Sequence, residues 1–165
     1  MEGLHNNNLT GETIVLFMSD HGDNLGSHHL FNKSRLIEES IRVPMIWSGP
    51  GITRTVNDRQ VAQTIDVMPT IVDQCGGYIP ASVQGRNLSS VLSGAQDQLE
   101  ESHAWIETDR REIGLRTTDH LYGLQLDKGG NPTSEGDSFF DLTIDPYEYD
   151  GIDPRTVGKD CDWED

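Results

Sequence analysis

A short, unbroken run of apolar residues that stops at an Asp-His pair constrains this chain more than any other feature. The run extends over 14–18, and Ser19, Asp20 and His21 follow it directly. A continuous apolar run bounded by polar turn residues is typical of a strand buried on both faces, as in a parallel sheet. Ligands of open α/β sheets lie beyond the carboxyl ends of such strands. The sequence therefore predicts a buried strand and a candidate site in the loop that follows it.

The residues of this loop allow two interpretations. Carboxylate oxygen and neutral imidazole nitrogen both bind divalent cations, so Asp20 and His21 indicate a metal site. The simpler interpretation is that Asp20 and Asn24 only build Asx turns while the histidines lie on the surface. From these residues alone, both interpretations stay open.

Further elements follow from apolar spacing and from turn residues. A short helix is predicted over 34–40 with Ser34 as its cap, and a second apolar strand over 43–47. A further helix begins at Asp66, tolerates Pro69 in its first turn, and ends at Gly76 or Gly77. Because helix capping already explains Asp66, we expect its role to be structural.

The second half of the chain has a different periodicity. Short strands are predicted there, those over 113–118 and 121–126 from alternating apolar residues, and a stretch rich in Gly, Asn, Pro and Ser over 127–138 predicts a loop. The predicted strands cover residues 103–107, 113–118, 121–126 and 139–142.

Composition excludes several classes of function. The chain has 165 residues, enough for a domain with a core, and a net charge of −16 that argues against nucleic-acid binding. We expect no membrane span, since no apolar window is long enough. An EF-hand needs Gly at its sixth position, which is Leu25 here, and the two cysteines, Cys75 and Cys161, are too isolated for a Cys/His zinc site. Whether they pair with each other stays open.

Two segments carry a resemblance to a known family. Residues 19–33, SDHGDNLGSHHLFNK, and 38–51, EESIRVPMIWSGPG, resemble the metal-binding segment of the type I sulfatases, in the alkaline phosphatase superfamily. The resemblance implies that Asp20 and His21 bind a divalent ion, most often calcium, with manganese, zinc and magnesium left open. It also implies that Lys33, thirteen positions after Asp20, is catalytic and contacts the sulfate. His28 keeps a family histidine that we expect to bind substrate, while a family glycine has become His29.

The resemblance extends over roughly residues 9–150. It includes the Asp-x-x-Pro-Thr helix at Asp66 and an ending, FDLTIDPYE, over 140–148. It implies an α/β fold, part of an alkaline-phosphatase-like sandwich with a mainly parallel sheet, followed by a small antiparallel carboxyl-terminal subdomain. The expected domains are 1–98, with the metal-site loop at 19–33, then 99–150, and an acidic tail over 151–165.

The function implied is metal-dependent hydrolysis of a sulfuric ester by a formylglycine nucleophile. Neither Cys75 nor Cys161 has the Cys-x-Pro-x-Arg setting of that nucleophile, so we expect it in an amino-terminal part that this chain lacks, and the chain alone to be inactive. Two alternatives stay open: a phosphonate or phosphate monoester hydrolase of the same superfamily, which His21 keeps possible, and a non-catalytic remnant. The expected substrate is a sulfated small molecule or carbohydrate. The oligomeric state stays open, and family habit suggests a periplasmic, secreted or lysosomal location.

Overall fold

The computed structural model describes residues 1–133 and 137–152, which form two units. The first unit comprises Met1–Asp20 and Pro44–Ser102, and the second comprises His21–Val43 and the described chain from His103 onward. The two units interleave along the sequence, whereas the predicted domains 1–98 and 99–150 are consecutive; that domain division stays a prediction. Most of the metal-site loop therefore belongs to the same unit as the carboxyl-terminal strands.

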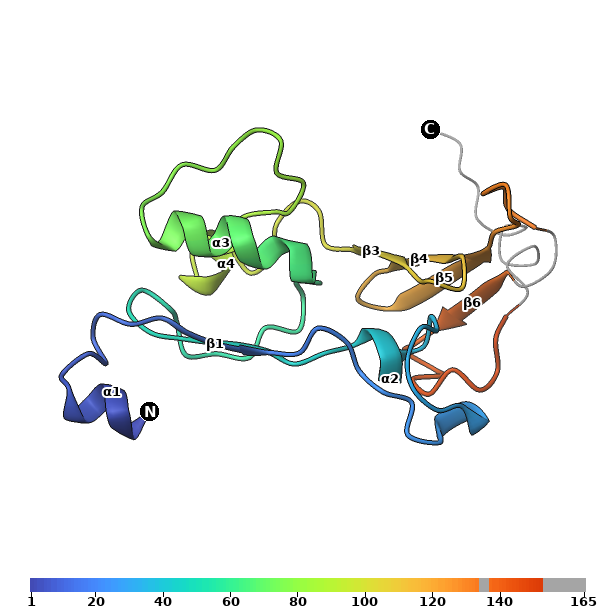
Figure 1. Ribbon diagram of the computed structural model, residues 1–165, viewed down its shortest axis with the longest axis horizontal. Helices are drawn as coiled ribbons and strands as arrows, with labels where there is room; N and C mark the ends of the chain where they lie inside the picture. The colour runs from blue at the N-terminus through green and yellow to red at the C-terminus, as the bar shows by residue number, and fades with distance from the viewer. Residues whose placement is uncertain (134–136, 153–165) are drawn as a thin grey trace. The chain divides into compact units, whose positions relative to one another are not determined.

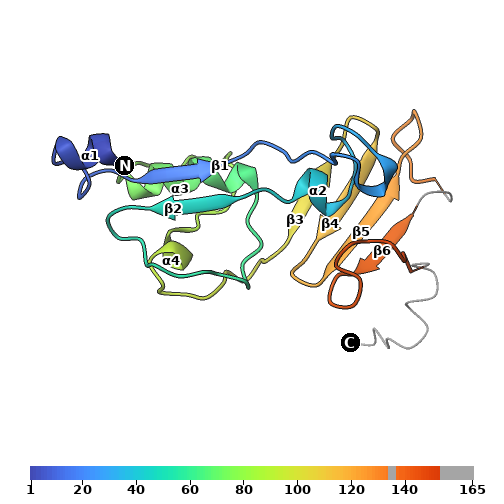
Figure 2. The same cartoon turned by 90° about the horizontal axis from the view of Figure 1, so that it is seen from below.

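The first unit consists of two strands and short helices. Strand β1 covers Val15–Met18 and β2 covers Met45–Ser48, and Figures 1 and 2 show helix α3 (Val67–Gln74) lying along one face of this pair. Helix α1 covers Glu2–Asn6, and α4 covers Ser89–Leu92. Among the described residues, no helix has the length and apolar character that crossing a membrane requires.

The pairing of the two strands differs from the expectation. Both strands form where apolar runs predicted them, but β1 pairs with β2 in antiparallel register, with Phe17 opposite Ile46. These two side chains are 63% and 58% exposed, so in the described part of the chain β1 is not buried on both faces. An apolar run predicts that a strand can be buried, but it does not predict whether the neighbouring strand is parallel or antiparallel.

Helix α3 forms where it was predicted, but the assignment of Asp66 as its side-chain cap is wrong: Asp66 ends a 3-10 turn over Thr64–Asp66, and its carboxylate accepts from the Gln63 N–H at the start of that turn. Pro69 is its third residue, within the first turn, where no intrahelical bond from its nitrogen is required. Gly76 has a positive φ of 71° after the helix, which is the left-handed conformation that ends many helices. Cys75 lies between them and is exposed, whereas Cys161 and the tail beyond residue 152 lie outside the described residues.

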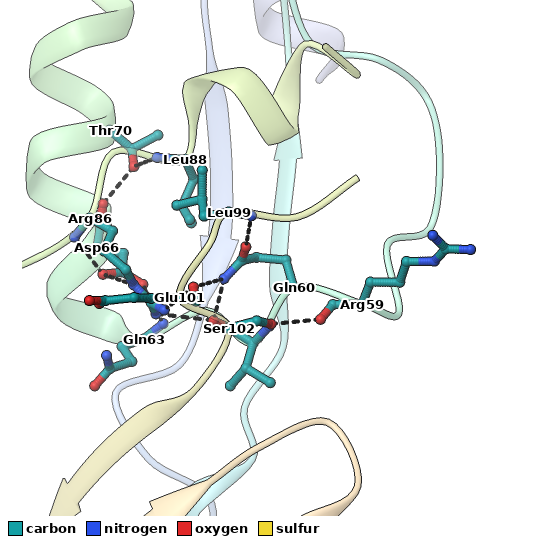
Figure 3. Close-up of polar contacts among 11 residues, drawn as sticks. Arg59, Gln60, Gln63, Asp66, Thr70, Arg86, Leu88, Leu99, Glu101 and Ser102 are labelled. Carbon is teal, nitrogen blue, oxygen red and sulfur yellow. Dashed lines mark hydrogen bonds and ion pairs between the residues drawn. The ribbon is translucent and has the colours of Figure 1, made fainter. Parts of the chain in front are cut away.

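A buried carboxylate fixes the start of this helix (Figure 3). Asp66 is fully buried and accepts hydrogen bonds from the backbone N–H groups of Gln63, at 2.9 Å, and Arg86, at 2.7 Å. The Arg86 guanidinium also donates to it at 2.7 Å. Thr70, one turn into the helix, donates to the Asp66 carbonyl and accepts from the Leu88 N–H. Asp66 therefore joins the helix start to a loop twenty residues away, a structural role.

The second unit contains an antiparallel sheet with neighbouring strands in sequence order (Figure 2). Its strands are β3 (Ala104–Glu107), β4 (Glu112–Arg116), β5 (His120–Gln125) and β6 (Ser138–Asp141). All four were predicted within two residues at each end, β4 and β5 of them from alternation. The sequence could identify them because each is short and bounded by turn residues.

The helix predicted over 34–40 is shorter than expected. Helix α2 covers only Glu38–Ile41, and Ile37 precedes it in an extended conformation. Ser34 has a positive φ of 74° and lies four residues before the helix, so its assignment as the cap is wrong. Residues 35–37 are instead held along the sheet by contacts that the local sequence does not reveal.

Strand β4 supplies those contacts. At its start, Glu112 accepts a hydrogen bond from the Leu36 backbone N–H at 3.2 Å and pairs with Arg35 at 2.6 Å. At its end, Arg116 donates to both carboxylate oxygens of Glu38, at 2.8 and 3.1 Å. Because residues 112 and 116 lie on the same face of the strand, the segment before α2 runs along that face.

Between these ion pairs, Leu36 packs against two glycines of the sheet. Gly114 and Gly123 are opposite one another in the β4–β5 register, and a Cβ at Gly114 would lie 2.9 Å from a Leu36 methyl. Leu36 is only 7% exposed and Leu121 is fully buried. The glycines thus make room for the side chain that fixes the metal-site loop to the sheet.

Candidate active site

The predicted metal ligands directly follow strand β1. The strand ends at Met18, and Asp20 and His21 come two and three residues later, as expected for residues at the carboxyl end of a strand. Asp20 is exposed, and the Ser19 hydroxyl lies 3.5 Å from its Oδ1. Asp20 ends the first unit and His21 begins the second, so each is described with its own unit.

The His21 ring has both nitrogens engaged. Nδ1 lies 2.7 Å from the carbonyl oxygen of Gly22, and Nε2 lies 2.5 Å from the Lys33 ammonium. An ammonium can only donate, so Nε2 is the acceptor and carries no proton in this arrangement, while Nδ1–H donates to the carbonyl. A backbone carbonyl that holds Nδ1–H in this way is the usual support of a histidine that binds metal through Nε2.

Gly22 places this part of the loop against helix α2. Its N–H donates to the Ser40 carbonyl at 2.9 Å, and a Cβ at this position would lie 1.9 Å from the carbonyl oxygen of Glu39. Any side chain would therefore push the loop away from the helix. The glycine that follows the Asp-His pair is required by this close approach.

Two backbone hydrogen bonds explain how Lys33 returns to His21. The Asn24 N–H donates to the Asn32 carbonyl, and the Gly26 N–H donates to the Leu30 carbonyl, both at 2.8 Å. These bonds close residues 24–32 into a compact loop. Lys33 leaves that loop beside the point where the chain enters it, twelve residues after His21.

His28 lies in a different environment. It has a positive φ of 51°, its Nε2 is 3.9 Å from a Glu39 carboxylate oxygen, and its ring centroid is 5.2 Å from that of Tyr149. One ligand atom each from His28, Glu39 and Glu148 lie within 4.8 Å of one another. The substrate-binding role expected for His28 stays a prediction, and neither carboxylate was identified as a site residue from the sequence.

The donor set at Asp20 and His21 fits a divalent cation. A carboxylate and an imidazole with an unprotonated Nε2 are both metal ligands, and the Lys33 ammonium shows that Nε2 accepts a cationic partner. An imidazole suits manganese or zinc better than calcium, whose ligands are oxygens. The chemistry of these residues therefore leaves the identity of the metal open.

Comparison with known proteins assigns the family. The sulfatase family model matches residues 1–78. The chain is 31% identical to arylsulfatase K of Mus musculus, over 90% of this chain and 28% of that protein. It is 29% identical to the multifunctional alkaline phosphatase superfamily protein PehA of Trinickia caryophylli, over 86% of this chain and 30% of that protein.

A solved structure supports the same assignment. The structure of a 2-O GAG sulfatase superposes with a TM-score of 0.74 and 27% identity, covering 96% of this chain and 34% of that one. The chain thus spans about 30% of the length of the curated relatives it matches. The expected α/β fold with its small antiparallel carboxyl-terminal sheet is confirmed. The chain belongs to the sulfatase family, in the alkaline phosphatase superfamily.

Proposed function

We propose that this chain supplies one side of a sulfatase active site, in which Asp20 and His21 hold a divalent ion and Lys33 contacts the sulfate. The observation that carries the proposal is the 2.5 Å contact between the Lys33 ammonium and His21 Nε2. It brings two of the residues implied by the family resemblance together across twelve positions of sequence. Calcium is the first candidate for the ion, with manganese, zinc and magnesium as alternatives.

His21 would present a fixed lone pair to the ion. Its Nδ1–H is held by the Gly22 carbonyl, which sets the tautomer and the ring orientation before any cation binds. Asp20, the preceding residue, would add a negatively charged oxygen. A bound divalent ion supplies Lewis-acid polarisation of the sulfate and lowers the pKa of an oxygen nucleophile.

Lys33 would bind the sulfate as a mobile point charge. A lysine ammonium has three donors on a flexible stem, which suits the oxygens of a tetrahedral anion whose charge changes during reaction. The chain carries a net charge of −16, which repels anions. Local positive charge from Lys33 and the cation is therefore needed for a sulfate to approach.

The substrate class we propose is a sulfated carbohydrate. The support is the similarity to a 2-O GAG sulfatase and, more generally, to an arylsulfatase. A second candidate is hydrolysis of a phosphate or phosphonate monoester. His21 favours it, because imidazole suits metals softer than calcium, and one relative is described as a multifunctional alkaline phosphatase superfamily protein.

Calorimetric titration with calcium and then manganese tests the metal assignment. Asp20→Ala should weaken binding by roughly tenfold or more, because a carboxylate ligand is lost. Asp58→Ala, which removes an exposed carboxylate from the first unit, is the matched control and should leave the affinity unchanged. Equal affinity in the Asp20→Ala and wild-type chains would contradict the assignment.

Titration of the metal-loaded chain with anions then distinguishes the two proposed substrate classes. Titration with sulfate, phosphate and methylphosphonate should show the tightest binding for sulfate, and Lys33→Ala should weaken it. Preference for phosphate or methylphosphonate would favour the second candidate.

A further inference from the structure

The second unit contains a cluster of one histidine and two glutamates, of which only His28 was expected to take part in the sulfatase site. His28 comes from the turn at Ser27–His29, Glu39 from helix α2, and Glu148 from the chain after β6. One ligand atom from each lies within 4.8 Å of the other two. We propose that His28, Glu39 and Glu148 form a second divalent-cation site, of the zinc or manganese type, which ties the metal-site loop to the carboxyl-terminal part of the unit.

Burial distinguishes this cluster from an ordinary acidic surface. Glu148 is only 4% exposed. One of its carboxylate oxygens accepts a hydrogen bond from the Glu38 backbone N–H at 2.8 Å, but the other has no hydrogen-bond partner among the described residues. His28 Nε2 is likewise buried without a hydrogen-bond partner in the part of the chain that the structure describes. Buried polar atoms of native proteins are nearly always paired, so two such atoms in one cluster mark a place where a ligand or an ordered water would bind.

The balance of charge points to a cation as that ligand. Arg116 makes a two-bond ion pair with Glu38, and no ion pair from it to Glu39 or Glu148 occurs among the described residues. Glu39 receives one hydrogen bond from the Ser27 hydroxyl, which carries no charge. Two carboxylates and an imidazole thus lie together, and keeping the buried Glu148 ionised beside Glu39, whose side chain is 32% exposed, would be costly without a cation. A divalent ion would neutralise both.

The donor set selects the kind of metal. One imidazole nitrogen and two carboxylate oxygens suit zinc or manganese, whereas calcium takes six to eight oxygens. Around a tetrahedral zinc, ligand atoms lie about 3.4 Å apart, given bonds of about 2.1 Å. Because the three atoms lie within 4.8 Å of one another, a contraction of at most about 1.4 Å would close the site, with solvent as the remaining ligand.

The test uses zinc and the full 165-residue chain. In an Asp20→Ala/His21→Ala background, which removes the proposed active-site ligands, competition against a chromophoric chelator should still show one bound zinc. Adding Glu148→Gln should weaken that binding by roughly tenfold or more, since a charged ligand becomes a neutral amide. Glu107→Gln, at an exposed position of the same unit, is the matched control and should not change the affinity.

A second measurement protects the test from a folding artefact. In the wild-type chain, the nitrogen NMR resonances of the His28 ring should shift on addition of zinc, while those of the exposed His5 ring should not. Absence of zinc binding in the background variant, or the same affinity with and without Glu148→Gln, would overturn the second site. Because the active-site ligands are absent from that background, this result does not depend on the outcome of the Asp20→Ala titration.

Discussion

A carboxylate oxygen of Glu148 accepts a hydrogen bond from the backbone N–H of Glu38 at 2.8 Å, which joins residues 110 positions apart. The contact lies within the second unit and caps the start of helix α2 with a residue from the chain after β6. The metal-site loop is thus held by groups near the end of the described chain. This linkage makes the loop sensitive to the protonation of one buried carboxyl.

The stability of the second unit should fall as the pH rises through the range 4.5 to 7. Burial raises the pKa of Glu148 from 4.5 to about 7; the Glu38 N–H opposes this, the charges of Glu38 and Glu39 add to it, and Arg116 opposes it. A raised pKa means that the folded state binds the proton more tightly, so this contribution is full below pH 4.5 and lost above pH 7. Its size is on the order of 2 kcal/mol, from about 1.4 kcal/mol per pKa unit reduced for partial solvation.

The measurement is urea unfolding with a metal chelator at several pH values. Glu148→Gln should remove this loss of stability between pH 4.5 and 7, because an amide does not titrate. Glu107→Gln, at an exposed position, should keep the wild-type profile. Parallel pH profiles for the wild type and Glu148→Gln would show that Glu148 is ionised at neutral pH in the folded chain.

Two Asp–Arg pairs of the first unit should differ sharply in their contribution to stability. Asp66 and Arg86 are 0% and 14% exposed in their side chains, whereas Asp97 and Arg59 are 78% and 66% exposed. Asp66→Ala leaves two backbone N–H donors without their acceptor and the Arg86 guanidinium without its counter-ion, which should cost about 3–5 kcal/mol. Asp97→Ala should cost less than about 1 kcal/mol, as exposed pairs do. Equal losses in urea unfolding would contradict the structural role of Asp66.

The sequence could predict those parts of the fold that depend on local patterns. Alternation predicted β4 and β5, and Pro69 with a terminal glycine predicted the extent of α3. The sequence could not predict the antiparallel partner of β1, because the same apolar run serves either direction. It missed the support of residues 35–38 as well, since Gly114 and Gly123 weaken a strand pattern while providing the space that Leu36 fills.

In the candidate site, too, residues in a local motif could be predicted, whereas residues brought together by long-range folding could not. The Asp20-His21 pair, Lys33 and the glycine after the pair are contiguous in a motif and could be identified from it. Glu39 and Glu148 belong to segments that the family resemblance covered, but they meet His28 only through long-range folding. The signal that could have drawn attention to Glu148 is its place in an Asp-Pro-x-Glu ending, where no capping role was apparent.

A methyl group at Gly114 should loosen the anchor of the metal-site loop. Its Cβ would meet both Leu36 methyls, at 2.9 and 3.1 Å, and Gly114→Ala should cost about 1–3 kcal/mol. In a Leu36→Ala background the added methyl finds space, so the same substitution should cost less there. Gly11→Ala, where nothing lies within 4 Å, is the control. Additive losses in the double variant would show that the two residues do not compete for space.

Lys33 and Asp20 should have opposite effects on metal affinity. The Lys33 ammonium lies against the nitrogen that we propose as a ligand, so it must leave when a cation binds. Lys33→Ala removes that competition and a like charge; at a separation of about 4 Å in water this is worth about 1 kcal/mol, or roughly fivefold tighter binding. Calorimetry with manganese measures it. Weaker binding in Lys33→Ala would mean that Lys33 supports the metal site.

The 165-residue chain should not hydrolyse sulfate esters by itself. No Cys-x-Pro-x-Arg or Ser-x-Pro-x-Arg segment occurs in it, so the formylglycine nucleophile implied by the family resemblance has no precursor. Phe17 and Ile46, opposite one another in the β1–β2 pair, are exposed apolar side chains, so we also expect self-association, measurable by sedimentation. The assay measures hydrolysis of an aryl sulfate and an aryl phosphate by the purified chain, first with calcium and then with manganese. Metal-dependent turnover by a monomer, abolished by Asp20→Ala, would require a nucleophile among the residues present and would give this chain a mechanism different from the one its family resemblance implies.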